Sequence, residues 1–225
     1  MNDVVICLLN PGGFDRAAQG LAGAGRRLAE ELGSQLTAIV LSPQSPGLAQ
    51  EVAQVVDKVI VVDQGEYQPE TALSALAEAC SQLSPAAVLF GNDTYSQEVT
   101  PRLAYRLGGA AVGDVVEVMV HEQSLRVSRQ VYGGKAQATI ELKRKPAVLW
   151  TRSRSFAPAN HLSTPGAITE LSVDIPKDTR TKIVERKRES QTEQRLEEAR
   201  VIVSGGRGIG GPEPLNDELK PLPEL

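Results

Sequence analysis

The chain has 225 residues, 41% of them hydrophobic, which is enough apolar side chain to build a sizeable core. Its formal net charge of −4 lacks the basic excess that nucleic-acid-binding domains carry. The two cysteines, Cys7 and Cys80, form no CxxC pair, and His121 and His161 stand alone. We therefore predict two buried thiols in a reducing compartment, no metal site and no nucleic-acid partner.

The amino-terminal residues predict no targeting segment. Residues 1–3 lead directly into an apolar run at 4–9, without the basic start of a signal peptide or an Arg-rich transit sequence. No apolar run approaches the roughly 20 residues that span a bilayer. We expect a bacterial cytoplasmic protein that does not insert into membranes.

The first half of the chain alternates short apolar runs with longer amphipathic ones. The apolar runs are continuous, which is typical of parallel strands covered by helices on both faces. The predicted strands lie at residues 4–9, 36–42, 58–63 and 86–92. The predicted helices lie at residues 15–33, 47–56, 68–83 and 96–109. The sequence thus predicts an α/β, Rossmann-like fold.

Residues typical of helix ends support these boundaries. Gly33 is placed to cap the end of the first helix, and Pro69 with Glu70 suits the first turn of the third. Asp93 and Thr94 follow a strand and precede a helix, where such side chains are ordinary N-caps. We assign Asp93 no catalytic role.

The pattern changes after Gly113. Runs at 114–120, 124–134, 135–143 and 146–152 follow one another with short turns and no helix between them. Alternation within the second and third runs predicts half-exposed antiparallel strands, so we expect a late antiparallel β meander. Residues 167–175 predict one more strand.

A charged stretch separates this part from the remainder. Residues 182–198 mix acidic and basic side chains and read as a solvated linker or exposed helix. We predict an N-terminal α/β domain at residues 1–181, the charged linker at 182–198, and the first strand and Gly-rich loop of a second domain at 199–225.

The Gly-rich loop is the richest candidate site. Residues 201–203 read as a buried strand, and Ser204, Gly205, Gly206, Arg207 and Gly208 follow it. Glycine backbone can converge on an anion, and the forked, permanently charged guanidinium of Arg207 suits a pyrophosphate. Spacing alone leaves a ligand loop and a simple turn equally open.

A second Gly-rich turn occupies residues 10–13. It is not a GxGxxG motif, and a tight turn is the simplest interpretation, although a mononucleotide could sit there at the carboxyl edge of a parallel sheet. No nucleophile, base and acid set, GxSxG, HExxH or Walker loop occurs, so we predict no catalytic residues.

Four separate stretches resemble the α subunit of electron-transfer flavoproteins. Residues 88–118 resemble the family's strand, loop and helix with its APRLAARLG core, and residues 129–141 (RQVYGGKAQATIE) resemble RPVYGGNALATV. Residues 145–158 (KPAVLWTRSRSFAP) resemble RPAVLTVRPGAF, and residues 197–213 (EEARVIVSGGRGIGGPE) resemble LEEADVIVSGGRGIGGPE. The matches come in the family's order and cover nearly the whole chain.

The resemblance implies an N-terminal α/β domain followed by a flavodoxin-like domain that binds FAD. It implies a heterodimer with a β subunit that carries AMP. The pair would take electrons from flavin dehydrogenases such as the acyl-CoA dehydrogenases of fatty acid beta-oxidation, and pass them to a downstream acceptor. The family's arginine that contacts FAD maps onto Arg207, with Ser204, Gly205, Gly206 and Gly208 shaping the same contact. Such a protein is an electron carrier rather than an enzyme with an organic substrate.

The resemblance stops short at the carboxyl end. The family's SR pair, its QVGQTG-type loop and its SGAIQH-type segment have no counterpart here, and Pro221 and Pro223 would interrupt a following helix. We expect this chain alone to bind FAD weakly or not at all. Two alternatives stay open: a cofactor-free docking subunit, and an adenine-nucleotide-binding module at residues 10–13.

Overall fold

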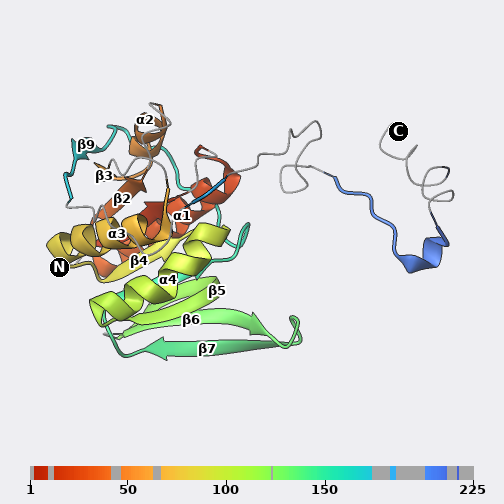
Figure 1. Ribbon diagram of the computed structural model, residues 1–225. Coiled ribbons are helices and arrows are strands. Elements are labelled where there is room, and N and C mark those ends of the chain that lie inside the picture. Colours follow the sequence, from red (N-terminus) through yellow and green to blue (C-terminus); the bar gives the residue numbers. More distant parts are fainter. Residues whose placement is uncertain are drawn as a thin grey trace. The chain divides into compact units, whose positions relative to one another are not determined.

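The computed structural model describes residues 3–9, 13–41, 47–62, 67–122, 124–173, 183–185, 201–211 and 217. The chain divides into two compact units, Met1–Lys182 and Ile183–Leu225. Within the first unit, helices alternate with strands up to α4 (Figure 1).

The helices and strands of the first unit follow one another in this order: β1 (Val4–Leu8), α1 (Arg16–Leu32), β2 (Leu36–Leu41), α2 (Leu48–Ala53), β3 (Lys58–Val62), α3 (Pro69–Leu83), β4 (Ala87–Phe90), α4 (Thr94–Leu107), β5 (Ala110–His121), β6 (Ser124–Val131), β7 (Ala136–Leu142), β8 (Ala147–Thr151) and β9 (Ala167–Glu170).

All of these strands join one nine-stranded sheet, in the order β7-β6-β5-β8-β4-β1-β2-β3-β9. In this order, the strands β5-β8-β4-β1-β2-β3-β9 pair in parallel. β6 pairs antiparallel with β5 on one side and with β7 on the other. The predicted α/β fold with a helix-covered parallel sheet and a late antiparallel meander is confirmed.

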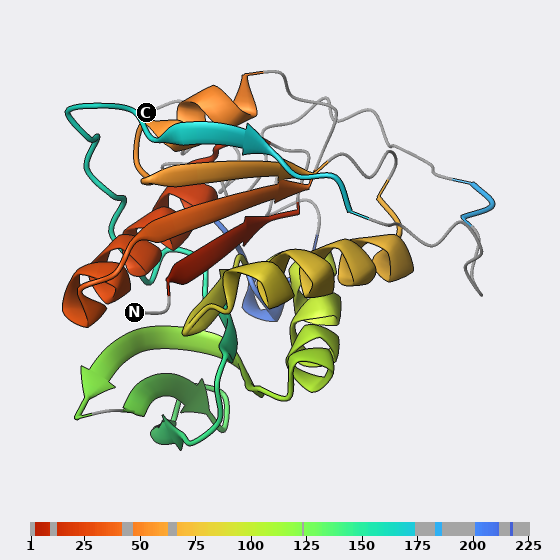
Figure 2. The same ribbon diagram turned by 90° about the vertical axis from the view of Figure 1, so that its left-hand side faces the viewer.

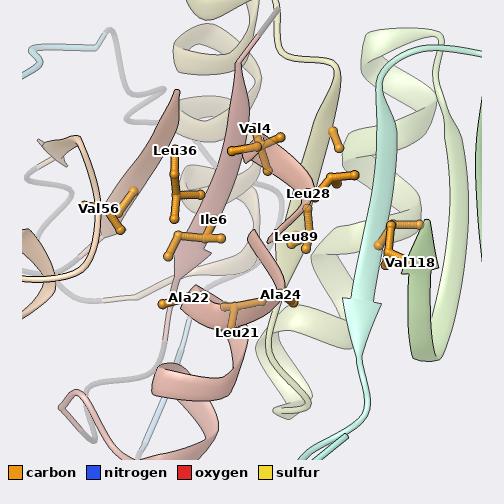
Figure 3. Close-up of a cluster of buried hydrophobic side chains, with 14 of the residues drawn as sticks. Val4, Ile6, Leu21, Ala22, Ala24, Leu28, Leu36, Val56, Leu89 and Val118 are labelled. Atoms are coloured by element: carbon orange, nitrogen blue, oxygen red, sulfur yellow. The ribbon is translucent and has the colours of Figure 1, made fainter. Parts of the chain in front are cut away.

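Two apolar layers hold the helices on the sheet, because successive strand residues point to opposite faces. On β1, Val4 and Ile6 face α1 and α2, whereas Val5 and Cys7 face α3 and α4. Figures 1 and 2 show α3 and α4 side by side on their face of the sheet. Figure 3 shows the other layer, where side chains of the strands meet side chains of α1. The labelled strand residues include Val4, Ile6, Leu36 and Leu89, and the labelled α1 residues are Leu21, Ala22, Ala24 and Leu28.

Local caps fix where α1 begins and ends. The Ala18 N–H donates to Asp15 Oδ1 at 2.8 Å, which satisfies one of the free donors of the first turn. At the other end Gly33 adopts a left-handed conformation with φ 60°, and its N–H reaches back to the Glu30 carbonyl. The predicted cap at Gly33 is confirmed.

The position of β8 differs from the prediction. Residues 146–152 were expected to continue the antiparallel meander, but β8 runs parallel between β4 and β5, in the middle of the sheet. Its side chains from Ala147 to Leu149 are buried on both faces. A run that is apolar at every position suits such a central strand better than a half-exposed meander strand.

The connection from β8 to β9 crosses the outer side of α1. We call residues 152–166 the crossing segment. It leaves the middle of the sheet, passes over α1 at Gly20 and Gly23, and enters β9 beside β3. The Leu162 N–H donates to the Gln54 carbonyl at 2.7 Å. The crossing segment thereby ties α1 and the end of α2 to the edge of the sheet.

The described part of the second unit contains one short helical turn. Residues 201–203 were expected to form a buried strand, but they form none, and Val201 is 80% exposed. A 3-10 turn follows at Arg207–Ile209, and Gly210 behind it has φ 88°. Apolar residues form a buried strand only where a sheet accepts them, and among the described residues no strand pairs with this run.

Candidate functional site

The Gly-rich loop at residues 204–211 is an open, exposed segment. Every described residue from 201 to 211 is exposed except Ile209, which is partly buried. A β-carbon on Gly206 or Gly208 would meet no atom within 4 Å. Among the described residues, the guanidinium of Arg207 has no hydrogen-bond or ion-pair partner. The Ile209 and Gly210 N–H groups are bonded within the turn, to the Gly206 and Arg207 carbonyls. The exposed backbone at residues 204–208 and the Arg207 cation are of the kinds that contact anions.

The candidate residues form an exposed segment rather than an enclosed site. Ser204, Gly205, Gly206, Arg207 and Gly208 are contiguous, and all five are exposed. A flavin is a large, mostly apolar ring system that binding sites bury. An exposed loop can hold its phosphates, but the ring needs further surface around it.

The first βα turn carries a negative charge at the N-terminus of α1. Gly13 adopts φ +85°, as glycine there was expected to allow, whereas residues 10–12 lie outside the described part of the chain. The Asp15 carboxylate already accepts from the Ala18 N–H. It occupies the helix end that a phosphate would use, which disfavours an anionic nucleotide at this turn.

Asp93 is confirmed as an N-cap. Its Oδ1 accepts from the Ser96 N–H at 2.9 Å, and its Oδ2 accepts from the Ser96 hydroxyl at 2.6 Å. Both carboxylate oxygens are thus engaged in starting α4. This geometry agrees with the prediction that Asp93 has a structural role.

The thiols are buried on the α3 and α4 side of the sheet. Cys7 lies on β1 and Cys80 on α3, and both are 1% exposed and free. Burial raises the pKa of Cys80 to about 12 and that of Cys7 well above its usual range. Neither thiol is poised as a nucleophile, since only the thiolate attacks.

No group of three potential metal ligands occurs among the residues that the structure describes. In the same part of the chain, no helix has the length and apolar character that a bilayer span requires.

Two hollows flank the crossing segment where it passes α1. One of about 250 Å³ lies between α1 and α2 and is lined by Phe14, Glu51 and His161 among others. A second, of about 630 Å³, is lined by Arg26 and Arg27 of α1, by Glu117 of β5 and by residues 155–162 of the crossing segment. Arg26 is already held by Asp57, with Nη1 and Oδ2 2.9 Å apart, so its charge is neutralised within the fold.

The aromatic residues Tyr132 and Trp150 lie in different settings. Tyr132 is 83% exposed in the turn between β6 and β7. Trp150, on β8, is partly buried and packs over Gly113, where a β-carbon would come within 2.0 Å of the indole Nε1. Tyr132 remains available to a partner, whereas Trp150 serves packing.

Sequence reasoning missed a polar cluster beside Trp150. The Arg152 Nε donates to Asp114 Oδ1 at 2.8 Å, and a second guanidinium nitrogen of Arg152 contacts Asp114 Oδ2. Asp114 has φ 60° at the point where the pairing of β5 shifts register. Only the fold brings these residues together, because 38 positions separate them in the chain.

Comparison with known proteins gives one family. Residues 4–176 match the model of a family described as "Electron transfer flavoprotein domain". The "Electron transfer flavoprotein subunit alpha" of Thermoanaerobacterium thermosaccharolyticum is 30% identical over 204 residues, which cover 87% of this chain and 62% of the relative. "Protein FixB" of Clostridium saccharobutylicum is 27% identical, covering 90% of this chain and 63% of the relative.

A third relative, the "Electron transfer flavoprotein subunit alpha" of Bacillus subtilis, is 26% identical, covering 90% of this chain and 62% of the relative. The chain thus spans less than two thirds of the length of each of these relatives.

Proposed function

The chain belongs to the electron transfer flavoprotein domain family, and from this premise we propose that it acts as an α-type subunit of an electron transfer flavoprotein. The observation that carries the proposal is the continuous family match over residues 4–176, which spans the sheet and its helices from β1 to β9. Relatives named "Electron transfer flavoprotein subunit alpha" support the α-type assignment.

The proposed cofactor is FAD, which would supply the redox chemistry of the carrier. Arg207 would contact its phosphates, and Ser204, Gly205, Gly206 and Gly208 would bring backbone N–H groups to the same anion. The exposed backbone and the free guanidinium fit this role. Because the same residues enclose nothing, the rest of the cofactor must be covered by other surface, and we expect the 225-residue chain alone to hold FAD weakly.

The proposed partner is a β subunit that carries AMP. The heterodimer would accept electrons from flavin dehydrogenases, such as acyl-CoA dehydrogenases, and pass them to a downstream acceptor. In this scheme the chain positions a cofactor and a partner but changes no organic substrate. The relatives' designation as a subunit supports a heteromeric assembly.

The experiment is a visible absorption spectrum of the 225-residue chain after co-expression with its cognate β subunit, incubation with FAD and desalting. We expect the two chains to co-purify. Flavin bands that survive desalting would show that partner surface completes the site. Chains that fail to co-purify would overturn the proposed function.

A cofactor-free docking subunit is the second candidate. The exposure of all but one residue in the stretch 201–211 favours it, since nothing described there shields a flavin from water. A stable but colourless complex in the same experiment, even at high FAD concentration, would select this candidate over the first. The Asp15 carboxylate at the N-terminus of α1 disfavours the adenine-nucleotide alternative, because it occupies the position that a phosphate would take.

A further inference from the structure

The turn between β6 and β7 holds an aromatic residue in a backbone conformation that such residues rarely adopt. Tyr132 has φ 53°, and Gly133 and Gly134 after it have φ 65° and 87°. Glycine would take the first of these positions without a steric penalty. The tyrosine is nonetheless 83% exposed, and its side chain forms no ring contact or hydrogen bond with another described residue. The fold itself gains nothing visible from this side chain.

The unfavourable backbone conformation of Tyr132 brings no visible gain within the fold, which suggests a role in contacting another molecule. Residues held in sparsely populated conformations concentrate at functional sites and ligand contacts. Tyrosine is also enriched among the residues that anchor protein interfaces, because it buries a large rigid ring at little entropic expense. Tyr132 therefore has the properties of an anchor whose partner is another molecule.

The hairpin that carries Tyr132 is strongly basic in a chain whose net charge is −4. Residues 124–145 contain one acidic residue, Glu141, and six basic ones: Arg126, Arg129, Lys135, Lys143, Arg144, Lys145. Glu141 already pairs with Arg126, whose Nη2 lies 3.4 Å from Oε2, and it accepts from the Ser124 hydroxyl at 3.0 Å. The remaining cations call for an acidic surface opposite them.

The same hairpin forms one edge of the sheet. β7 is the terminal strand in the sheet order, so among the described strands it pairs only with β6 and leaves its outer backbone groups free. Figure 1 shows β6 and β7 running together below α4, joined by a turn at the right of the view. The exposed tyrosine, the basic residues and the unpaired edge of β7 thus all belong to the β6–β7 hairpin.

From these observations we propose that the β6–β7 hairpin, residues 124–145, is the docking element for the β-type subunit. Tyr132 inserts into an apolar pocket of that subunit, and Lys135 in the same turn faces an acidic group at its rim. Lys143, Arg144 and Lys145 lie at the other end of the hairpin and face acidic groups there. This inference rests on the proposed function and names the surface through which it operates. A protein partner accounts for the tyrosine, which a polyanion such as DNA would not require at this turn.

The experiment compares three tyrosine variants and Lys135→Glu in the full chain for binding to the purified cognate β subunit by titration calorimetry. Tyr132→Ala is the test, and Tyr105→Ala is its matched control, because Tyr105 on α4 is also exposed, at 89%. Tyr132→Gly is added because glycine relaxes the positive φ. Its melting temperature should therefore equal or exceed that of the wild type.

We expect both Tyr132 variants to weaken binding about tenfold or more, Tyr105→Ala to change it less than about twofold, and Lys135→Glu to weaken it most at low salt. If the wild type binds the β subunit and Tyr132→Gly binds it with the same affinity, the docking inference is overturned and the proposed function stands. Absence of wild-type binding would overturn both. Full displacement of the β subunit by equimolar duplex DNA would also overturn the docking inference, by identifying the basic hairpin as a nucleic-acid surface.

Discussion

Gly23 of α1 and Ala157 of the crossing segment pass so close that no side chain fits between them. A β-carbon on Gly23 would lie 1.8 Å from the carbonyl oxygen of Ala157. One turn earlier, a β-carbon on Gly20 would lie 3.0 Å from the carbonyl oxygen of Phe156. The helix and the crossing segment are thus in backbone contact, and small residues on α1 are a condition of that contact.

Gly23→Ala should destabilise the protein by about 2–3 kcal/mol, since a backbone carbonyl cannot move aside as a flexible side chain can. The measurement is urea unfolding followed by far-UV circular dichroism. Gly47→Ala is the matched control, because Gly47 has φ −86° and a β-carbon there meets nothing within 4 Å. Equal stability of the two variants would contradict the contact.

Asp57→Ala should cost about 1–3 kcal/mol of folding free energy. Asp57 Oδ2 accepts from Arg26 Nη1 at 2.9 Å and from the Leu36 N–H at 2.8 Å, so its loss leaves two partly buried donors unpaired. Glu98→Ala removes a more exposed helical ion pair with Arg102, and should change stability by less than about 0.5 kcal/mol. Chemical denaturation of both variants checks the ranking, and a reversed order would refute it.

Gly113→Ala should displace the Trp150 indole, because the new β-carbon would come within 2.0 Å of Nε1. Trp150 is the single tryptophan of the chain, so intrinsic fluorescence reports its surroundings directly. We expect a red-shifted emission maximum as the ring moves toward water. Gly47→Ala should leave the spectrum unchanged, and an unshifted maximum in Gly113→Ala would rule out the packing of this pair.

The buried thiols should make the fold sensitive to alkaline pH. Burial raises the pKa of Cys80 from its ordinary value of 9.0 to about 12, so the folded state favours the neutral thiol. The resulting stabilisation is complete below pH 9 and is lost as pH rises from 9 toward 12. Denaturation midpoints from pH 7 to 11 should fall less steeply in a Cys7→Ala/Cys80→Ala variant than in the wild type.

At neutral pH, a thiol reagent should label neither cysteine in the folded chain and both after unfolding in guanidinium. Rapid labelling of the native protein would show that one of the two thiols is accessible.

Arg207→Ala should weaken FAD binding by the complex with the β subunit about tenfold to a hundredfold, through the loss of a charge-assisted contact. The measurement is quenching of flavin fluorescence during titration. Arg154→Ala, which removes an exposed arginine of the first unit, is the control. Equal affinity in the two variants would exclude Arg207 from the cofactor contact.

Sequence reasoning located the helices and strands well where the pattern was strong and local. The caps at Gly33 and Asp93 depend on neighbouring residues only, and both were predictable. The place of β8 depends on which strands lie beside it, and its apolar run suits several sheet positions. Pairing partners far away in the chain decided between them, as Val148 shows by lying beside both Val88 and Ala111.

The anion contact expected at residues 204–208 stays a prediction. The structure shows only that these residues are exposed, which a ligand loop and a simple turn share. The strand expected at residues 201–203 failed because burial depends on what covers a segment, which composition does not state. The left-handed conformation of Tyr132 was likewise invisible, since nothing in tyrosine itself favours it.

Because β8 lies between β4 and β5, the centre of the sheet cannot be completed until β8 has been synthesised. β4 and β5 are separated by α4 alone in the chain, yet they become neighbours of a strand that emerges from the ribosome after the whole meander. During synthesis the sheet has a gap at its centre until residues 147–151 arrive. The backbone edges of β4 and β5 that pair with β8 lack their native partner in that interval and are open to non-native strand pairing.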